Sequence, residues 1–271
     1  MLDETATRGD LVVRKASAED YGAFSRLFPE LLVDDPVPSA AVWASLLLPT
    51  TWVAVRDEQV VGYCYFQEYE ETGYVRNIVV APAARGSGVG RALMQATAAY
   101  LRSRHKTSWR LNVKPDNRAA LALYERMGMR TKYLAKLFRL PWVALKVLSA
   151  GSVAARALTA DRDHALETLF ELPRGQLAAA RGVGRVLLEA VAPGEARSVG
   201  LAVFDPKFPG AFPFRIQQRE ALPALLVAMR AHVPTDEYVK LVVEDDARLA
   251  ELLESMGATL GGEFVHMEAP L

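Results

Sequence analysis

The feature that most constrains the fold of this chain is an internal repeat, because its second half follows the pattern of its first. A valine–glycine pair inside an apolar run occurs at Val61-Gly62 and again at Val199-Gly200. A helix-like segment ends in Met-Gly at residues 127–128 and again at residues 256–257. A repeat of this length implies two copies of one structural plan. We therefore expect two domains of the same fold within the 271 residues.

Local patterns predict the same order of elements in both copies. Alternating or continuous apolar runs predict strands, while capping residues, prolines and glycines bound the helices. In the first copy we expect strands at residues 11–16, 51–55, 60–69, 74–80, 109–113 and 131–140, and helices at 17–28, 39–49, 91–101 and 118–127. In the second copy we expect a strand and helix cap at 156–161, strands at 186–191, 198–204 and 238–243, and helices at 163–172, 221–226 and 245–256.

This order predicts an α/β fold in which a mixed central sheet is flanked by helices. We place the first domain at residues 10–140, a linker at 141–153 and the second domain at 154–271. The apolar run at 140–148 contains a lysine and is too short to span a membrane. We interpret it as a packed connector.

A glycine-rich segment stands between the strand at 74–80 and the helix that follows it. Three glycines occur in five positions, and the full segment is Arg85, Gly86, Ser87, Gly88, Val89, Gly90 and Arg91. Glycines allow close approach of the backbone and left-handed angles. A helix start offers unpaired N–H groups and the positive end of the helix dipole. Strand, glycine turn and helix together predict a cradle for a pyrophosphate; the alternative is a structural turn.

Three known phosphate-binding motifs compete for this segment. The P-loop requires Gly-Lys-Ser/Thr, which residues 90–92 do not supply. The dinucleotide fingerprint requires G-x-G-x-x-G and an acid about 20 residues on, whereas the glycines here are spaced G-x-G-x-G. The pattern R-x-x-G-x-G fits, and residues 78–93 as a whole resemble the GNAT acyltransferases. The order of elements over residues 10–140 is similar to that family as well.

The resemblance implies that acetyl-CoA is the cosubstrate and that residues 85–91 hold its pyrophosphate. It also implies that the backbone of Ile78, Val79 and Val80 pairs with the pantetheine arm. A second family motif, N-x-x-A-x-x-x-Y-x-x-x-G, matches residues 117–128, with a methionine at 129 where the family usually has phenylalanine. By this resemblance, Asn117 and Ala120 contact the coenzyme. Tyr124 is the expected general acid for the leaving thiolate; its other reading is a core residue.

The general base is less well defined by the sequence. The strand at 74–80, where many family members carry a glutamate, contains no acid in its interior. Glu68 and Glu70, with Glu71, lie just before it and form a tentative base region; the alternative is a solvated turn. A base is unnecessary if the acceptor amine arrives neutral. The four histidines are scattered without ligand spacing, and we expect no metal site.

The second copy departs from the first where the glycine segment would lie. Gly62 and Gly128 are 66 positions apart, but Gly200 and Gly257 only 57. Residues 212–226 pass from strand to helix without a glycine. The run at 181–185 imitates the motif, but it precedes a strand, and we interpret it as a loop. We therefore expect a degenerate second domain without a pyrophosphate site.

Composition narrows the class of protein. Lys and Arg together number 32, as do Asp and Glu, so the net charge is zero and a general nucleic-acid binder is disfavoured. One cysteine, Cys64, excludes a disulfide framework and suits a reducing compartment; its apolar surroundings predict a core thiol. No run is long enough to span a membrane, and residues 1–5 lack the apolar run of a signal peptide. We expect a soluble, cytoplasmic protein, with pairing into a homodimer left open.

These observations predict an acetyl-CoA-dependent N-acetyltransferase that moves an acetyl group directly to a primary amine in a ternary complex, with its active site in the first domain. The acceptor is a small molecule or a peptide. One alternative is a tandem acetyltransferase resembling mycothiol synthase. A second is a noncatalytic acyl-CoA sensor, favoured by the missing acid, and a third is a scaffold in which both sites are inactive.

Overall fold

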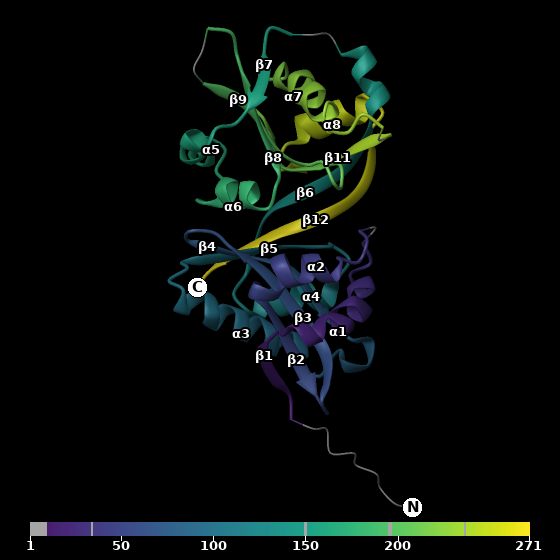
Figure 1. Ribbon diagram of the computed structural model, residues 1–271, viewed down its shortest axis with the longest axis vertical. Helices are drawn as coiled ribbons and strands as arrows, with labels where there is room; N and C mark the ends of the chain where they lie inside the picture. The colour runs from purple at the N-terminus through teal and green to yellow at the C-terminus, as the bar shows by residue number, and fades with distance from the viewer. Residues whose placement is uncertain (1–9, 34, 149–150, 195–196, 236) are drawn as a thin grey trace, which may run out of the picture. The chain divides into compact units, whose positions relative to one another are not determined.

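The computed structural model describes residues 10–33, 35–148, 151–194, 197–235 and 237–271. The chain forms two compact units (Figure 1). Unit 1 contains Met1–Asn112, Arg118–Arg130 and Met267–Leu271, and unit 2 contains Val113–Asn117 and Thr131–His266. Each unit is built from a mixed sheet flanked by helices, as the sequence predicts.

The sheet of unit 1 runs in the order of the chain. It contains β1 (Val12–Lys15), β2 (Thr51–Arg56), β3 (Gln59–Glu68), β4 (Thr72–Val80) and β5 (Ser108–Val113). The strands β1 to β4 pair with one another in antiparallel fashion, and β5 is parallel to β4. The last residues of β12 (Thr259–Pro270) also belong to unit 1, where the backbone N–H of Leu271 donates to the carbonyl of Thr107.

Helices cover both faces of this sheet. One face packs on α1 (Tyr21–Leu27) and on the segment that begins with α2 (Ala40–Val42), continues as a π-helix (Trp43–Leu47) and ends as a 3₁₀ helix (Leu48–Thr50). The other face packs on α3 (Val89–Ser103), and α4 (Arg118–Arg126) follows β5. Side chains alternate along β3, so Tyr63 contacts α1 while Cys64 contacts α3.

The strand β4 has two irregularities that matter for function. A β-bulge interrupts its pairing with β3, since Tyr65 lies opposite Asn77 while Phe66 lies opposite Val75, which leaves Arg76 as the extra residue. On its other edge, β4 pairs with β5 only from Thr72–Ser108 to Val75–Leu111. The two parallel strands therefore separate beyond Val75.

Unit 2 has a sheet in the order β12-β6-β11-β10-β9-β8-β7. Its other strands are β6 (Arg130–Pro141), β7 (Ala154–Ala157), β8 (Val186–Val191), β9 (Ser198–Asp205), β10 (Gly210–Ile216) and β11 (Tyr238–Glu244). Its helices are α5 (Asp163–Leu169), α6 (Gln176–Gly182), α7 (Ala221–Arg230) and α8 (Ala247–Ser255), and a 3₁₀ helix spans Trp142–Val147. The core joins α7 and α8 to the sheet through residues such as Leu225, Phe204 and Leu253.

The compact units do not coincide with the predicted copies. The strand β6, which we assigned to the first domain, pairs along its length with β11 of unit 2, from Pro141–Tyr238 to Ala135–Glu244. The end of β12 belongs to unit 1. The division into copies at 10–140 and 154–271 therefore stays a prediction about the repeat.

Three local predictions were wrong in detail. The helix expected at 17–28 is divided into a 3₁₀ turn at Ala18–Asp20, α1 and a second 3₁₀ turn at Phe28–Leu31 that contains Pro29. The helix expected at 163–172 ends at Leu169. The helix α6 was not expected, and its end takes up part of the glycine run at 181–185, with Gly184 in a left-handed conformation (φ +78°).

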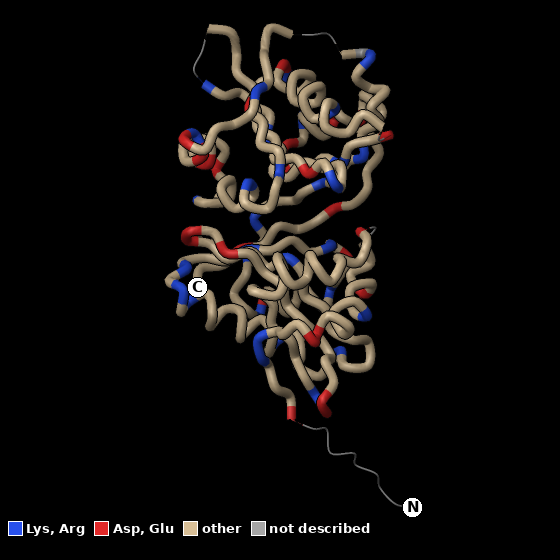
Figure 2. Tube along the Cα trace, in the orientation of Figure 1, with Lys and Arg blue, Asp and Glu red and all other residues tan. Residues whose placement is uncertain are grey.

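Charges of both signs are interspersed over each unit (Figure 2), as the zero net charge of the chain suggests. Among the described residues, no helix combines the length and the apolar character needed to cross a bilayer.

Candidate functional site

The glycine-rich segment lies in the predicted context, between β4 and α3. A 3₁₀ helix at Pro82–Ala84 follows β4, and Gly88 is the N-cap of α3. Gly86 and Gly88 have φ angles of +74° and +87°. No atom lies within 4 Å of a Cβ built at either residue. The left-handed backbone conformation therefore explains why glycine occurs at these two positions. A side chain there would not clash with neighbouring atoms.

The backbone N–H groups of this segment are available to a ligand. Ala84 and Arg85 donate to carbonyls of the 3₁₀ turn, and the next donor along the chain is Ala92, which bonds to the carbonyl of Gly88. Within the described part of the chain, the backbone N–H groups of residues 86–91 have no hydrogen-bond acceptor. Six consecutive unsatisfied donors at a helix start form an anion-binding nest, which the helix dipole reinforces.

Side chains hold the loop in place. Arg85 donates to the carbonyl of Val80 at 3.2 Å and pairs with Glu30 at 2.6 Å. Ser87 Oγ donates to the carbonyl of Ala84 at 2.7 Å. These contacts hold the loop in its conformation. Arg85 therefore supports the shape of the loop as well as supplying a positive charge.

Arg56, at the end of β2, also reaches the loop. Its Nη1 donates to Ser87 Oγ at 3.0 Å, and its buried Nε has no acceptor among the described residues. The sequence analysis did not predict this residue. Arg56 is 31 positions from Ser87, and only the pairing of β2 with β3 and of β3 with β4 brings the two together.

The glycine segment, β4 and α4 meet at Gly90. A Cβ at Gly90 would lie 3.2 Å from Cδ2 of Leu123 and 3.8 Å from Cγ2 of Val80. This close approach places α4, and with it Tyr124, against the start of α3. The second motif is therefore next to the first in space.

The edge of β4 that faces β5 is open beyond Val75. Ile78, Val79 and Val80 pair with β3 on one side, opposite Cys64, Tyr63 and Gly62. On the other side, no strand in the described part of the chain pairs with residues 77–80. An extended ligand arm can therefore add to this edge through main-chain hydrogen bonds.

Tyr124 is buried at 4% exposure, and this burial, with the nearby Cys64 as a smaller cause, raises the pKa of its phenol well above the ordinary value of 10. A tyrosine that keeps its proton at neutral pH is able to donate a hydrogen bond to a developing anion. Cys64 is fully buried, accepts a hydrogen bond from Thr97 Oγ1 at 3.4 Å and has its pKa raised by burial to about 12. The prediction of a core thiol is confirmed, because such a thiol is not a nucleophile near neutral pH.

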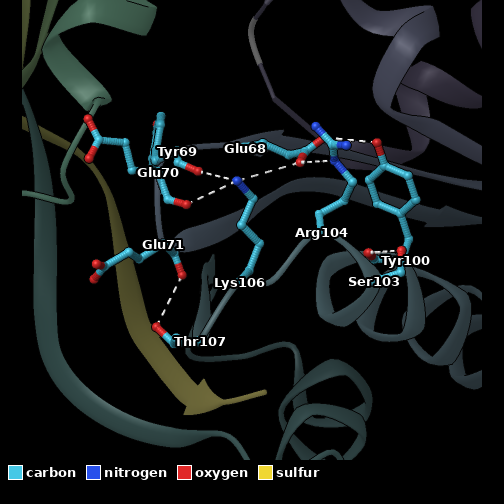
Figure 3. A network of polar contacts seen from close by, with 9 residues as sticks. All are labelled: Glu68, Tyr69, Glu70, Glu71, Tyr100, Ser103, Arg104, Lys106 and Thr107. Carbon is cyan, nitrogen blue, oxygen red and sulfur yellow. Dashed lines mark hydrogen bonds and ion pairs between the residues drawn. The ribbon is translucent and has the colours of Figure 1, made fainter.

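Glu68 faces α3 and is held by several donors (Figure 3). It accepts a hydrogen bond from the hydroxyl of Tyr100 at 3.0 Å, and Arg104 and Lys106 lie 3.6 and 3.7 Å from its Oε2. Lys106 also donates to the carbonyls of Tyr69 and Glu70 at 2.6 and 3.1 Å. The carboxylate ties the hairpin end to α3, and this network does not single it out as a base.

Most of the remaining predicted residues are on the surface. Figure 3 shows the side chains of Glu70 and Glu71 turned away from Lys106, and both residues are exposed. Asn117 is exposed just before α4 and counts with unit 2, whereas Ala120 is half-buried within α4. Arg91 is exposed on the first turn of α3. The described residues contain no group of three or more His, Cys, Asp or Glu side chains arranged to hold a metal ion.

The corresponding strand–helix junction of unit 2, between β10 and α7, has no such nest. The N–H groups of Gln217 and Gln218 donate to the carbonyl of Val199, and those of Ala221 and Leu222 donate to the carbonyls of Gln218 and Arg219. Most donors around the start of α7 are therefore satisfied within the chain. The absence of a pyrophosphate site from the second domain stays a prediction.

Comparison with known proteins gives a family match for part of the chain. Residues 20–129 match the model of the acetyltransferase (GNAT) family. The chain is 33% identical over 90 residues to a mycothiol acetyltransferase of Streptomyces griseus. The matched region covers 32% of this chain and 29% of that relative. The chain thus matches less than a third of the length of that relative.

Solved structures of other proteins superpose on all or nearly all of this chain. A putative acetyltransferase from Pyrococcus horikoshii superposes with a TM-score of 0.74 at 17% identity, over 100% of this chain and 93% of the other. A tandem GNAT protein from the clavulanic acid biosynthesis pathway superposes with a TM-score of 0.65 at 18% identity, over 96% and 98%. These identities show the fold alone. Residues 20–129 of this chain thus form a domain that matches the acetyltransferase (GNAT) family, and the fold of the whole chain is similar to that of a tandem GNAT protein.

Proposed function

We propose that this protein is an acetyl-CoA-dependent N-acetyltransferase whose coenzyme binds in unit 1. The observation that carries the proposal is the row of six unsatisfied backbone N–H groups at residues 86–91. These donors are placed to hold the pyrophosphate of the coenzyme. The open edge of β4 at Ile78, Val79 and Val80 then receives the pantetheine arm, and Tyr124 stands on the helix that packs against the same loop.

Direct transfer of the acetyl group needs few further catalytic groups from the protein. The acceptor nitrogen attacks the thioester carbon, the carbon–sulfur bond breaks, and the sulfur takes up a proton while the nitrogen loses one. Burial keeps Tyr124 protonated, so we assign its hydroxyl as the hydrogen-bond donor that stabilises the leaving sulfur. Binding both substrates in one geometry supplies much of the remaining acceleration.

The acceptor arrives as a neutral amine in this proposal. Glu68, the first candidate for a base, accepts a hydrogen bond from Tyr100 and lies within 4 Å of two cations. Glu70 and Glu71 are exposed at the turn. With no carboxylate committed to the acceptor, the nitrogen releases its proton to water. The rate should therefore rise with pH until the amine is fully deprotonated.

Two alternative functions can be tested against this proposal. The relatives named mycothiol acetyltransferase favour a related acceptor, although the similarity covers only a third of the chain. A noncatalytic acyl-CoA sensor is favoured by the lack of a committed base. The sensor binds the coenzyme as tightly as the enzyme does, but it shows no turnover for Tyr124→Phe to reduce.

The test is a titration of acetyl-CoA into the wild type, followed by an amine screen. We expect one site per chain and thiol release that depends on an added amine. Two sites per chain would contradict the assignment of the second domain as degenerate. Saturable binding without turnover over a broad set of amines would support the sensor, and the absence of binding would leave a scaffold.

A further inference from the structure

The two parallel strands β10 and β11 of unit 2 separate in the same way as β4 and β5. They pair only at Gly210–Lys240 and Ala211–Leu241. Beyond that point β10 continues along β9, up to Ile216 opposite Gly200, and β11 continues along β6, up to Glu244 opposite Ala135. A wedge therefore opens between the two strands, although this copy has no pyrophosphate nest.

The wedge leads into a cavity of about 190 Å³ that is lined entirely by residues of unit 2. Its apolar wall comes from β10, β11 and the two flanking helices, and includes Phe170, Phe214, Ile216, Val243 and Leu249. By volume alone, a space of about 150 Å³ is large enough for one benzene ring. The space therefore suits one ring or a short branched chain and is too small for a nucleotide.

Charged groups surround the cavity, and most are acidic. Three carboxylates and one guanidinium line it, namely Glu171, Glu244, Asp246 and Arg215. Arg215 is already neutralised, because its Nη2 makes a short ion pair with Glu244 Oε2. The lining therefore carries a net negative charge at neutral pH from Glu171 and Asp246.

The two remaining carboxylates, Asp246 and Glu171, differ in how they are held by the rest of the protein. Asp246 accepts a hydrogen bond from the backbone N–H of Leu249 at 2.9 Å and so caps α8. Glu171 is exposed in a left-handed conformation (φ +52°) immediately after α5. A carboxylate beside a cavity with a partly apolar lining attracts a cation that also carries an apolar group.

We propose that this cavity binds a small organic cation, a primary or alkylated amine attached to a single ring or a short apolar chain. The apolar part fills the space between Phe170, Phe214 and Leu249, and the ammonium group lies toward Glu171 and Asp246. The net negative lining disfavours phosphorylated ligands and carboxylates, so the site differs in charge preference from the nest at residues 86–91. The proposal does not depend on the function of unit 1.

Three probes of matched shape test the charge preference on the full-length protein: 2-phenylethylamine, 2-phenylethanol and 3-phenylpropionate. Binding is followed by ligand-observed NMR and by the thermal shift that a ligand of the native state produces. We expect saturable binding of the amine, weaker binding of the alcohol and none of the acid. Equal binding of all three, or binding of none, would overturn the proposal.

Two variants test the location. Glu171→Gln removes an exposed charge and should weaken binding of 2-phenylethylamine about three- to tenfold, whereas Glu251→Gln, an exposed position on α8 outside the lining, should leave it unchanged. Ile216→Trp fills the cavity and should abolish binding. Because Ile216→Trp is able to disturb the fold, the location of the site is decided by comparing Glu171→Gln with Glu251→Gln. Equal affinities of these two variants for 2-phenylethylamine would refute the site.

Discussion

Gly88 is the position at which the proposed coenzyme site can be tested with the least disturbance of the fold. Its φ is +87°, and no atom lies within 4 Å of a Cβ built on it. A side chain there strains the backbone by about 1–2 kcal/mol but causes no clash. Gly257, at the end of α8, has a φ of +86° and the same free space. It is a matched control for strain in unit 2.

The effect of charge can be worked out separately from that of strain. Gly88→Gln introduces the strain alone, and Gly88→Glu adds a carboxylate beside the N–H groups of residues 86–91. Two unit charges about 5 Å apart, at an effective dielectric constant of about 40, repel by about 1.7 kcal/mol. Since the pyrophosphate is an anion, the glutamate variant should bind acetyl-CoA at least about tenfold more weakly than the glutamine variant.

Calorimetric titration of acetyl-CoA into four proteins measures this difference: the wild type, Gly88→Gln, Gly88→Glu and Gly257→Glu. We expect the wild-type affinity to be retained in Gly257→Glu, and the gap between the two Gly88 variants to narrow at high salt. Equal affinities of Gly88→Glu and Gly88→Gln at low salt would refute the placement of the coenzyme at this loop.

Three further predictions concern unit 1. Tyr124→Phe should lower kcat about 10²-fold or more while the Kd for acetyl-CoA stays within about twofold; an unchanged kcat in a steady-state assay would remove Tyr124 as the acid. Arg56→Ala should weaken acetyl-CoA binding by loosening the loop at Ser87, and Arg56→Lys should restore part of it, as titration can show; equal loss in both variants would contradict a hydrogen-bonding role. The pKa of Cys64 is raised by burial from 9.0 to about 12, so between those pH values the unfolded chain loses a proton that the folded chain keeps, and stability falls as pH rises. Urea unfolding at pH 8 and pH 10 should therefore show a larger loss for the wild type than for Cys64→Ala, and an equal loss would refute this account.

The sequence predicted the local features of the fold well. The glycine segment at 85–90 and the turn at Gly128 have short-range signatures, because left-handed backbone and helix caps are decided by neighbouring residues. The order of strands and helices followed for the same reason. Helix boundaries were less certain, as Pro29 and the break after Leu169 show.

Long-range pairing was beyond the sequence analysis. The contact of Arg56 with Ser87 depends on how two hairpins pair, and the contacts of Glu68 with Arg104 and Lys106 depend on where α3 lies on the sheet. A lone arginine or glutamate near a turn has no local signature that separates these roles from simple solvation. The basic residues at 104 and 106, soon after the expected helix, were the only available hint.

The membership of the last five residues in unit 1 has a consequence for how the protein is made. During synthesis, residues 10–130 leave the ribosome long before residues 267–271, yet these join the same compact unit. The β6 strand, next in the chain, pairs with β11 of unit 2. Unit 1 therefore cannot complete its sheet until residues 267–271 have been synthesised, and its nascent form exposes an unpaired edge that a chaperone or a neighbouring chain is able to engage.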